Sequence, residues 1–179
     1  SPKKFKPASL TESDLSTIST SQRQVLTYRS FEFMDEDTLN AVWNQTMDEV
    51  EVGELSGPYD AEQVPQEYPL SKRFGIKQSS KVRCVDDFTQ SSINACAQTC
   101  ESPKPHTVDI LCSMCLALMK VSDGNSTWEA RSFDLKSAYR QCAIHPGHAR
   151  YSYIAVPHPQ EKRVKCFRMK ALPFGSVMS

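Results

Sequence analysis

The chain has 179 residues, of which 39% are hydrophobic and 23% are charged, and its formal net charge is zero. These values are typical of a globular protein large enough to bury a core of ordinary size. No stretch approaches the roughly 18 consecutive apolar residues of a membrane-spanning helix and no apolar signal segment opens the chain, so we expect no membrane partner.

The charges are unevenly distributed along the chain. Residues 1–70 carry 13 acidic and 5 basic side chains, whereas residues 71–179 carry 8 acidic and 16 basic ones. A basic C-terminal portion is expected of a surface that neutralises phosphates, although the same bias also fits an ordinary solvated face. Seven cysteines, an odd number, favour free thiols in a reducing, intracellular compartment over a disulfide framework. Because the chain begins with Ser1 and stops at Ser179 within a motif, we interpret it as an internal fragment.

The N-terminal part divides into two predicted regions. Residues 1–25 are rich in Ser, Thr and Lys with little periodicity, so we expect a flexible tail or linker. Residues 26–66 contain a helical pattern from about Leu39 to Val50, with aspartates before it and Gly53 after it. The Ser-Gly-Pro sequence at 56–58 should then break the chain.

The C-terminal part alternates between strand and helix patterns. Residues 81–86 follow a basic loop and alternate as a short strand does, and residues 107–121 form an apolar helical stripe. Residues 128–135 are a candidate strand. The clearest hairpin consists of 151–156 and 163–169, joined by a loop that is rich in proline and charge.

Four short segments carry the chemical argument. They are KVRCVDDF at 81–88 followed by SIN at 92–94, FDLKSAYRQ at 133–141, IHP at 144–146 leading into the hairpin, and LPFG at 172–175. In this order the segments resemble the fingers strand, palm motif A, the following palm hairpin and motif B of reverse transcriptases of the LTR-retrotransposon and retroviral type. The resemblance covers residues 67–179. The long stretch between Asp87 and Asp134 suggests an insertion near 95–106.

The resemblance implies an α+β fold, a partial polymerase palm with part of the fingers. The palm would be an antiparallel sheet of 128–135, 151–156 and 163–169 packed against the helix at 107–121, with the fingers portion near 68–94. The implied activity is that of an RNA-directed DNA polymerase, which extends a primer on an RNA or DNA template with dNTPs and Mg²⁺.

Nucleotidyl transfer needs positioning and charge neutralisation, which two Mg²⁺ ions supply when carboxylates on a rigid element hold them. Asp134, at the end of an apolar strand pattern, is the expected catalytic metal ligand, and the resemblance adds the carbonyl of Leu135. An aspartate that caps a turn is the simpler alternative. The resemblance also implies a dNTP-binding set that contains Arg83, Lys81, Leu135, Ser137, Ala138, Tyr139, Phe174 and Gly175.

Individual members of this set have distinct implied roles. The planar, always-charged guanidinium of Arg83 suits a triphosphate, and Lys81 or Lys77 would supply a second cation. An aromatic ring at Tyr139 would lie beneath the incoming sugar and exclude a 2′-hydroxyl, the group that separates RNA from DNA substrates. A core tyrosine is the alternative. Ser137 and Ala138 would offer backbone N–H groups to the phosphates.

The family also uses a paired Asp-Asp motif on a second hairpin, which does not follow Asp134 in this chain. We therefore expect the fragment alone to be inactive. Two rival hypotheses are a decayed or domesticated remnant that binds nucleic acid without catalysis, and an RNA-dependent RNA polymerase, which Tyr139 disfavours. A zinc site built from Cys96, Cys100, Cys112 and Cys115 is a weaker hypothesis, because Cys112 and Cys115 lie in the apolar stripe.

Overall fold

The computed structural model describes residues 7–31, 34–98, 107–122, 129, 131–135 and 138–174, with the backbone alone at 27–29. It divides into two compact units, Ser1–Thr99 with Ser137–Ser179 and, separately, Cys100–Lys136. No helix in the described part of the chain has the length and apolar character needed to cross a membrane.

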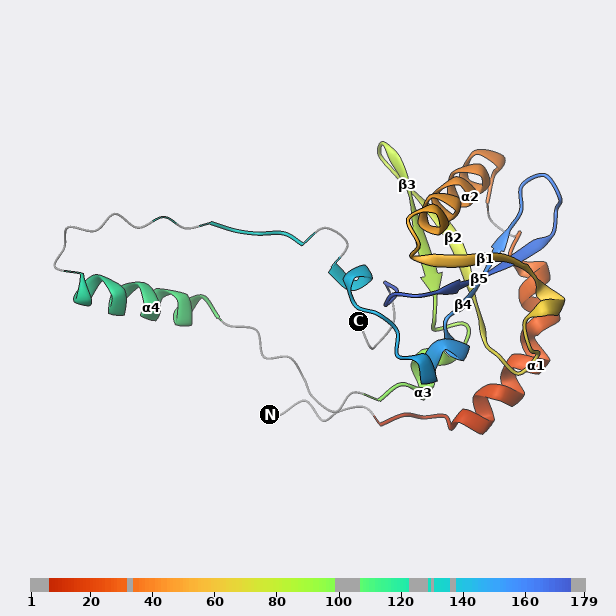
Figure 1. The fold of residues 1–179 in the computed structure, drawn as a ribbon, viewed down its shortest axis with the longest axis horizontal. Coiled ribbons are helices and arrows are strands. Elements are labelled where there is room, and N and C mark those ends of the chain that lie inside the picture. The colour runs from red at the N-terminus through yellow and green to blue at the C-terminus, as the bar shows by residue number, and fades with distance from the viewer. Residues whose placement is uncertain are drawn as a thin grey trace. The chain divides into compact units, whose positions relative to one another are not determined.

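The first unit has an α+β fold built on one five-stranded mixed sheet (Figure 1). The strands lie in the order β1-β5-β4-β2-β3. Its elements in chain order are α1 (Glu12–Arg29), α2 (Glu36–Glu51), β1 (Leu55–Asp60), η1 (Ala61–Gln63), β2 (Leu70–Gln78), β3 (Lys81–Asp87), α3 (Ile93–Cys96), η2 (Ala138–Gln141), η3 (Pro146–Tyr151), β4 (Tyr153–Pro157) and β5 (Val164–Met169).

The predicted α+β fold is confirmed, but the sheet that contains 151–156 and 163–169 is mixed and not purely antiparallel. The β2–β3 hairpin joins the β4–β5 hairpin in a single sheet, because β2 pairs with β4 in parallel from Leu70↔Tyr153 to Lys72↔Ala155. The other pairs, β1–β5, β4–β5 and β2–β3, are antiparallel. A parallel pairing needs a long connection between the strands, which sequence periodicity does not identify.

Both faces of the sheet are covered. Alternate residues along β4 and β5 enter two different clusters, as the two-residue period of a strand requires. Ile154 and Phe167 join Val42 of α2 on one face, whereas Ala155 and Cys166 join Leu26 of α1 on the other. The sheet is therefore the middle layer between α2 and α1, which is why β4 and β5 are its most deeply buried strands.

Helix α1 replaces most of the expected N-terminal linker. Thr11 and Asp14 cap its first turn reciprocally: the Thr11 N–H donates to Asp14 Oδ2 at 2.9 Å, and the Asp14 N–H donates to Thr11 Oγ1 at 3.2 Å. Its buried face mixes leucines with polar residues, which hides the helical period from a hydrophobicity pattern. The buried positions are Leu15, Ser19, Arg23 and Leu26, and the buried Ser30 directly follows the helix.

The start of β1 contains the Ser-Gly-Pro sequence that we expected to break the chain. Gly57 has φ +136°, and a Cβ there would lie 2.9 Å from the carbonyl oxygen of Cys166 on β5. The ladder shifts register between Ser56 and Tyr59, so the glycine allows a bulge in an edge strand. Pro58 is tolerated because β1 is an edge strand of the sheet.

The second unit contains the predicted helix, α4 (Val108–Val121), with Thr107 at its N-cap. By itself this unit buries no residue of the helix. The expected strand at 128–135 is not formed by the residues described there, 129 and 131–135, which have no regular secondary structure. The packing of α4 on the sheet stays a prediction.

Candidate nucleotide site

Three side chains from separate segments meet at one place in the first unit. The rings of Tyr139 and Phe174 have centroids 4.9 Å apart and an interplanar angle of 84°, an edge-to-face contact. The Arg83 guanidinium carbon lies over the Phe174 ring, 5.6 Å from its centroid. Tyr139 is 37% exposed and Phe174 is 45% exposed, so this cluster is open to solvent. These residues belong to three of the four segments singled out in the sequence.

Backbone hydrogen bonds hold the segments of Tyr139 and Phe174 together. The N–H of Leu172 donates to the carbonyl of Cys142 at 2.8 Å, and the N–H of Ile144 donates to the carbonyl of Lys170 at 3.0 Å. An isolated antiparallel bridge joins Ala143 to Ala171, which lie between the residues of these two hydrogen bonds. The Cys142 N–H also donates to the Tyr139 carbonyl at 3.0 Å, which closes the η2 turn. The aromatic pair is therefore a consequence of a short ladder between the two segments.

Strand β3 supplies the cationic side of the cluster. Val82 and Cys84 pack on the α2 side of the sheet, so the alternation of a strand places Arg83 on the opposite side. Lys77 is engaged elsewhere, in an ion pair with Asp35 at the start of α2. The hydrogen bond to Asp35 raises the pKa of Lys77. Of the two lysines left open by the sequence, Lys81 is the one that makes no ion pair with the described residues.

A buried ion network reaches Arg140, the neighbour of Tyr139 in the chain, and the sequence analysis did not identify it. Arg73 is fully buried and donates from Nε and Nη2 to the two carboxylate oxygens of Asp86, at 2.7 and 3.0 Å. Its Nη1 donates to Glu49 Oε2 at 2.8 Å and to Thr46 Oγ1 at 3.1 Å. Arg140 donates to the same oxygen of Glu49 at 3.1 Å.

The network is electrostatically stable because its charges are paired. Burial acts to lower the pKa of the Arg73 guanidinium, but the carboxylates of Asp86 and Glu49 outweigh it, so that pKa is raised. In the sequence, the only indication of this ion pair is that Arg73 and Asp86 lie in two successive strands. Their pairing depends on the β2–β3 register, in which Arg73 lies opposite Asp86.

The remaining predicted site residues are next to Tyr139 in sequence, belong to the second unit or are outside the described residues. Ala138 begins η2, directly before Tyr139. Asp134 and Leu135 belong to the second unit, where both are exposed. Ser137 and Gly175 lie outside the described residues. In the part of the chain that is described, no cluster of three or more His, Cys, Asp or Glu side chains is arranged to hold a metal ion.

Asp134 and Leu135 offer oxygen donors only, a carboxylate and a backbone carbonyl. Magnesium prefers hard oxygen ligands of this kind and keeps several waters when it binds to one or two carboxylates. The donor chemistry therefore fits Mg²⁺, and the exposure of both residues leaves room for the ion and its waters.

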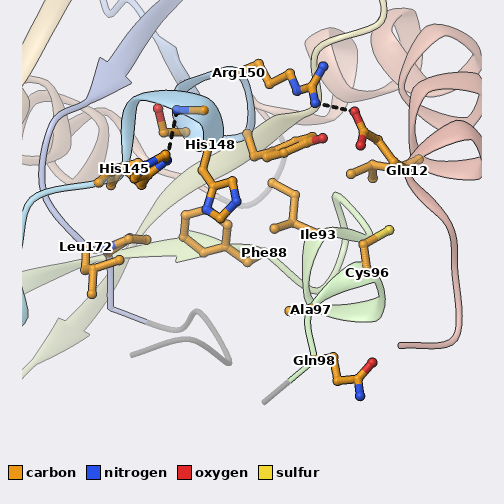
Figure 2. Close-up of a pocket in the computed structure, with 16 residues that line it drawn as sticks. Glu12, Phe88, Ile93, Cys96, Ala97, Gln98, His145, His148, Arg150 and Leu172 are labelled. Atoms are coloured by element: carbon orange, nitrogen blue, oxygen red, sulfur yellow. Dashed lines mark hydrogen bonds and ion pairs between the residues drawn. The ribbon is translucent and has the colours of Figure 1, made fainter. Parts of the chain in front are cut away.

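A cavity of about 590 Å³ lies next to the cluster, between α1, α3 and η3 (Figure 2). Phe88 and Ile93 line its apolar side, and His145 and His148 line it from η3. Leu172 and Pro173, which directly precede Phe174 in the chain, also line it. Among the predicted dNTP-binding residues that the structure describes, none lines the cavity.

The polar groups of the cavity are mostly engaged with each other. His145 Nδ1 accepts a hydrogen bond from the Gly147 N–H at 3.1 Å, and Arg150 forms an ion pair with Glu12 (Figure 2). Burial raises the pKa of the Cys96 thiol, which therefore stays protonated near neutral pH. The cavity is thus a weaker candidate for chemistry than the cluster of Arg83, Tyr139 and Phe174.

No protein-family model matches this chain, and no curated protein is significantly similar to it. Function is therefore argued from the residues and their geometry.

Proposed function

We propose that this chain is the fingers-and-palm portion of an RNA-directed DNA polymerase. The observation that carries the proposal is the convergence of Arg83, Tyr139 and Phe174. The motif resemblance implies that all three belong to one nucleotide site. Their contacts, 4.9 Å between rings and 5.6 Å from guanidinium to ring, are those of neighbours in a single site. Residues from three distant segments would rarely meet in this way by chance.

The cluster presents groups suited to the parts of a deoxynucleotide. Arg83, with Lys81 near the turn of the same hairpin, would bind the triphosphate through charge-assisted hydrogen bonds. The exposed Tyr139 ring would lie against the sugar, and Phe174 would border the base. A tyrosine that is 37% exposed fits a ligand-facing role better than the alternative of a core tyrosine.

Asp134 and the Leu135 carbonyl would hold Mg²⁺ in the proposed enzyme. The metal would neutralise the charge that develops on the transferring phosphoryl group and align the attacking and leaving oxygens. The partner carboxylates would come from an Asp-Asp motif downstream of this chain. Ser137 and Ala138, with small side chains, would allow the phosphates to approach their backbone N–H groups.

Primer extension by the full-length protein tests the proposal. With an RNA template, a DNA primer, dNTPs and Mg²⁺, we expect extension that Asp134→Asn reduces by more than tenfold in kcat, a barrier change above about 1.4 kcal/mol. Asp109→Asn is the matched control, because Asp109 is an exposed carboxylate in the same unit. Both variants should keep the wild-type circular dichroism spectrum.

The same assay separates the rival hypotheses. A non-catalytic remnant would bind the template and primer without extending the primer. Its downstream sequence would lack an intact Asp-Asp motif. An RNA-dependent RNA polymerase would prefer rNTPs. Either result would overturn the proposal, as would an Asp134→Asn variant with more than about a tenth of the wild-type kcat.

A further inference from the structure

One carboxylate oxygen joins the core of the sheet to the turn that carries Tyr139. Glu49 Oε2 accepts hydrogen bonds from Arg73 on β2 at 2.8 Å and from Arg140 on η2 at 3.1 Å. The other oxygen of Glu49 accepts from Gln45, one turn earlier in α2, at 3.3 Å. The Glu49 side chain is 13% exposed, so these contacts are shielded from water.

Arg140 depends on this contact for its position. Its side chain is 10% exposed, and its Nη1 is buried without a hydrogen-bond partner among the described residues. Its Nε lies 3.7 Å from Glu54, which is an ion pair but is too long for a hydrogen bond. Within the described part of the chain, Glu49 is therefore the acceptor that fixes the guanidinium.

Arg73 makes Glu49 itself immobile. The guanidinium of Arg73 is held in a bidentate contact by Asp86, which leaves its Nη1 directed at α2, where it meets Glu49. Planar guanidinium groups bind carboxylates in fixed geometry. Asp86 on β3 therefore fixes the orientation of the Arg73 side chain, and Arg73 in turn fixes the orientation of the Glu49 carboxylate. One end of this series of contacts reaches the proposed site, since Arg140 directly follows Tyr139.

We infer that Glu49 is a positioning residue that sets the place of the Tyr139 ring relative to Phe174 and Arg83. The inference rests on the proposed function for its catalytic meaning, and on the contacts alone for its structural meaning. Glu49 lies on α2, outside every segment that resembles a polymerase motif. By fixing Arg140, it would fix the adjacent ring that selects the sugar.

The structural arm of the test uses ¹⁹F NMR of the chain labelled with 3-fluorotyrosine. Tyr139→Phe identifies the Tyr139 resonance. We expect Glu49→Gln to move this resonance toward its position in the urea-unfolded chain and to broaden it. The resonances of Tyr68 and Tyr153, whose rings pair 5.9 Å apart in the cluster on the α1 side of the sheet, should stay in place. Loss of the whole fold would move all three.

Two further variants keep the test decisive. Glu51→Gln, at an exposed position of the same helix, is the matched control and should leave the Tyr139 resonance unchanged. Arg140→Met breaks the contact from its other end and leaves the Arg73–Asp86 pair intact, so it answers the question even if Glu49→Gln unfolds. Combining Glu49→Gln with Arg140→Met should add little to either single shift, because both remove one interaction. Additive shifts, or a Tyr139 resonance that Arg140→Met leaves in place, would overturn the inference.

The functional arm measures kcat and KM in the full-length protein. We expect Arg140→Met to lower the preference for dNTP over rNTP and to raise KM for dNTP, with unchanged affinity for the template–primer duplex. A loss that appears equally in both nucleotides would mean that Arg140 is merely structural. If the wild-type protein extends no primer, the proposed function fails while the ¹⁹F result still decides whether Glu49 positions Tyr139.

Discussion

Replacing Tyr139 with valine tests whether its ring selects the sugar of an incoming nucleotide. The ring is 37% exposed and makes one edge-to-face contact, with Phe174 at 4.9 Å. Such a contact contributes about 0.5–1.5 kcal/mol beyond the area that it buries. Truncating a fully buried aromatic residue would instead cost about 3–5 kcal/mol. We therefore expect Tyr139→Val to lower the free energy of unfolding by only about 1–2 kcal/mol.

We expect Tyr139→Val to affect the choice between dNTP and rNTP more strongly than it affects the stability of the fold. Removing a steric barrier of a few heavy atoms changes discrimination by about 1–3 kcal/mol, a factor of roughly 10–200. The assay compares kcat/KM for a dNTP and the matching rNTP on the same enzyme, at a temperature below the melting point of the variant. Tyr68→Val is the control, because Tyr68 belongs to an aromatic pair on another part of the sheet. An unchanged dNTP:rNTP ratio in Tyr139→Val would refute the proposed position of the ring.

Three other predictions follow from the described contacts. Arg83→Ala should lower kcat/KM for dNTP by about ten- to a hundredfold, since a charge-assisted contact to phosphate contributes about 1.5–3 kcal/mol. Filter binding should show that the affinity for the template–primer duplex is unchanged. An equal loss of duplex affinity would place Arg83 on the nucleic-acid backbone instead. Arg73→Met should lower the free energy of unfolding in urea by about 3–5 kcal/mol, because it leaves the carboxylate of Asp86 buried without its cation and Glu49 with Arg140 alone, and a loss below about 1 kcal/mol would contradict the network. Burial raises the pKa of both the Cys84 and Cys166 thiols to about 11. At pH 8 iodoacetamide should therefore label the exposed Cys142 well before either of them, and mass spectrometry of a timed reaction would show the reverse order if the burial were wrong.

The elements that the sequence predicted well are those whose signals are local. Helix α2 begins at Glu36 with Asp35 as its N-cap, whose carboxylate accepts from the Thr38 N–H at 2.8 Å, and Gly53 follows the helix with φ +82°. The strand at 81–86 and both strands of the C-terminal hairpin are also confirmed within a few residues. Capping chemistry and strand alternation act over a few residues, so a single sequence displays them.

The elements that were missed depend on partners far along the chain. In α1, Arg23 donates to the carbonyls of Val64 at 3.1 Å and Pro65 at 2.6 Å. Contacts of this kind allow the buried face of the helix to contain polar residues, which a hydrophobicity pattern does not mark as buried. The Thr11–Asp14 capping box was a local signal that would have located its start. For the candidate site, the motif resemblance grouped Arg83, Tyr139 and Phe174. The contact of Glu49 with Arg140 could not be predicted from the motifs, because it forms through tertiary packing.

The order of the strands has a consequence for how the protein is made. Leu55 in β1 pairs with Met169 in β5, and Leu70 in β2 pairs with Tyr153 in β4. During translation, β1 therefore leaves the ribosome long before β5, and the β2–β3 hairpin long before β4. Contacts between such distant segments form slowly, because the intervening chain must first be ordered. Until β4 and β5 emerge, Leu55 and Leu70 lack the residues of these strands that bury them, and we expect the nascent chain to be a substrate for chaperones and proteases.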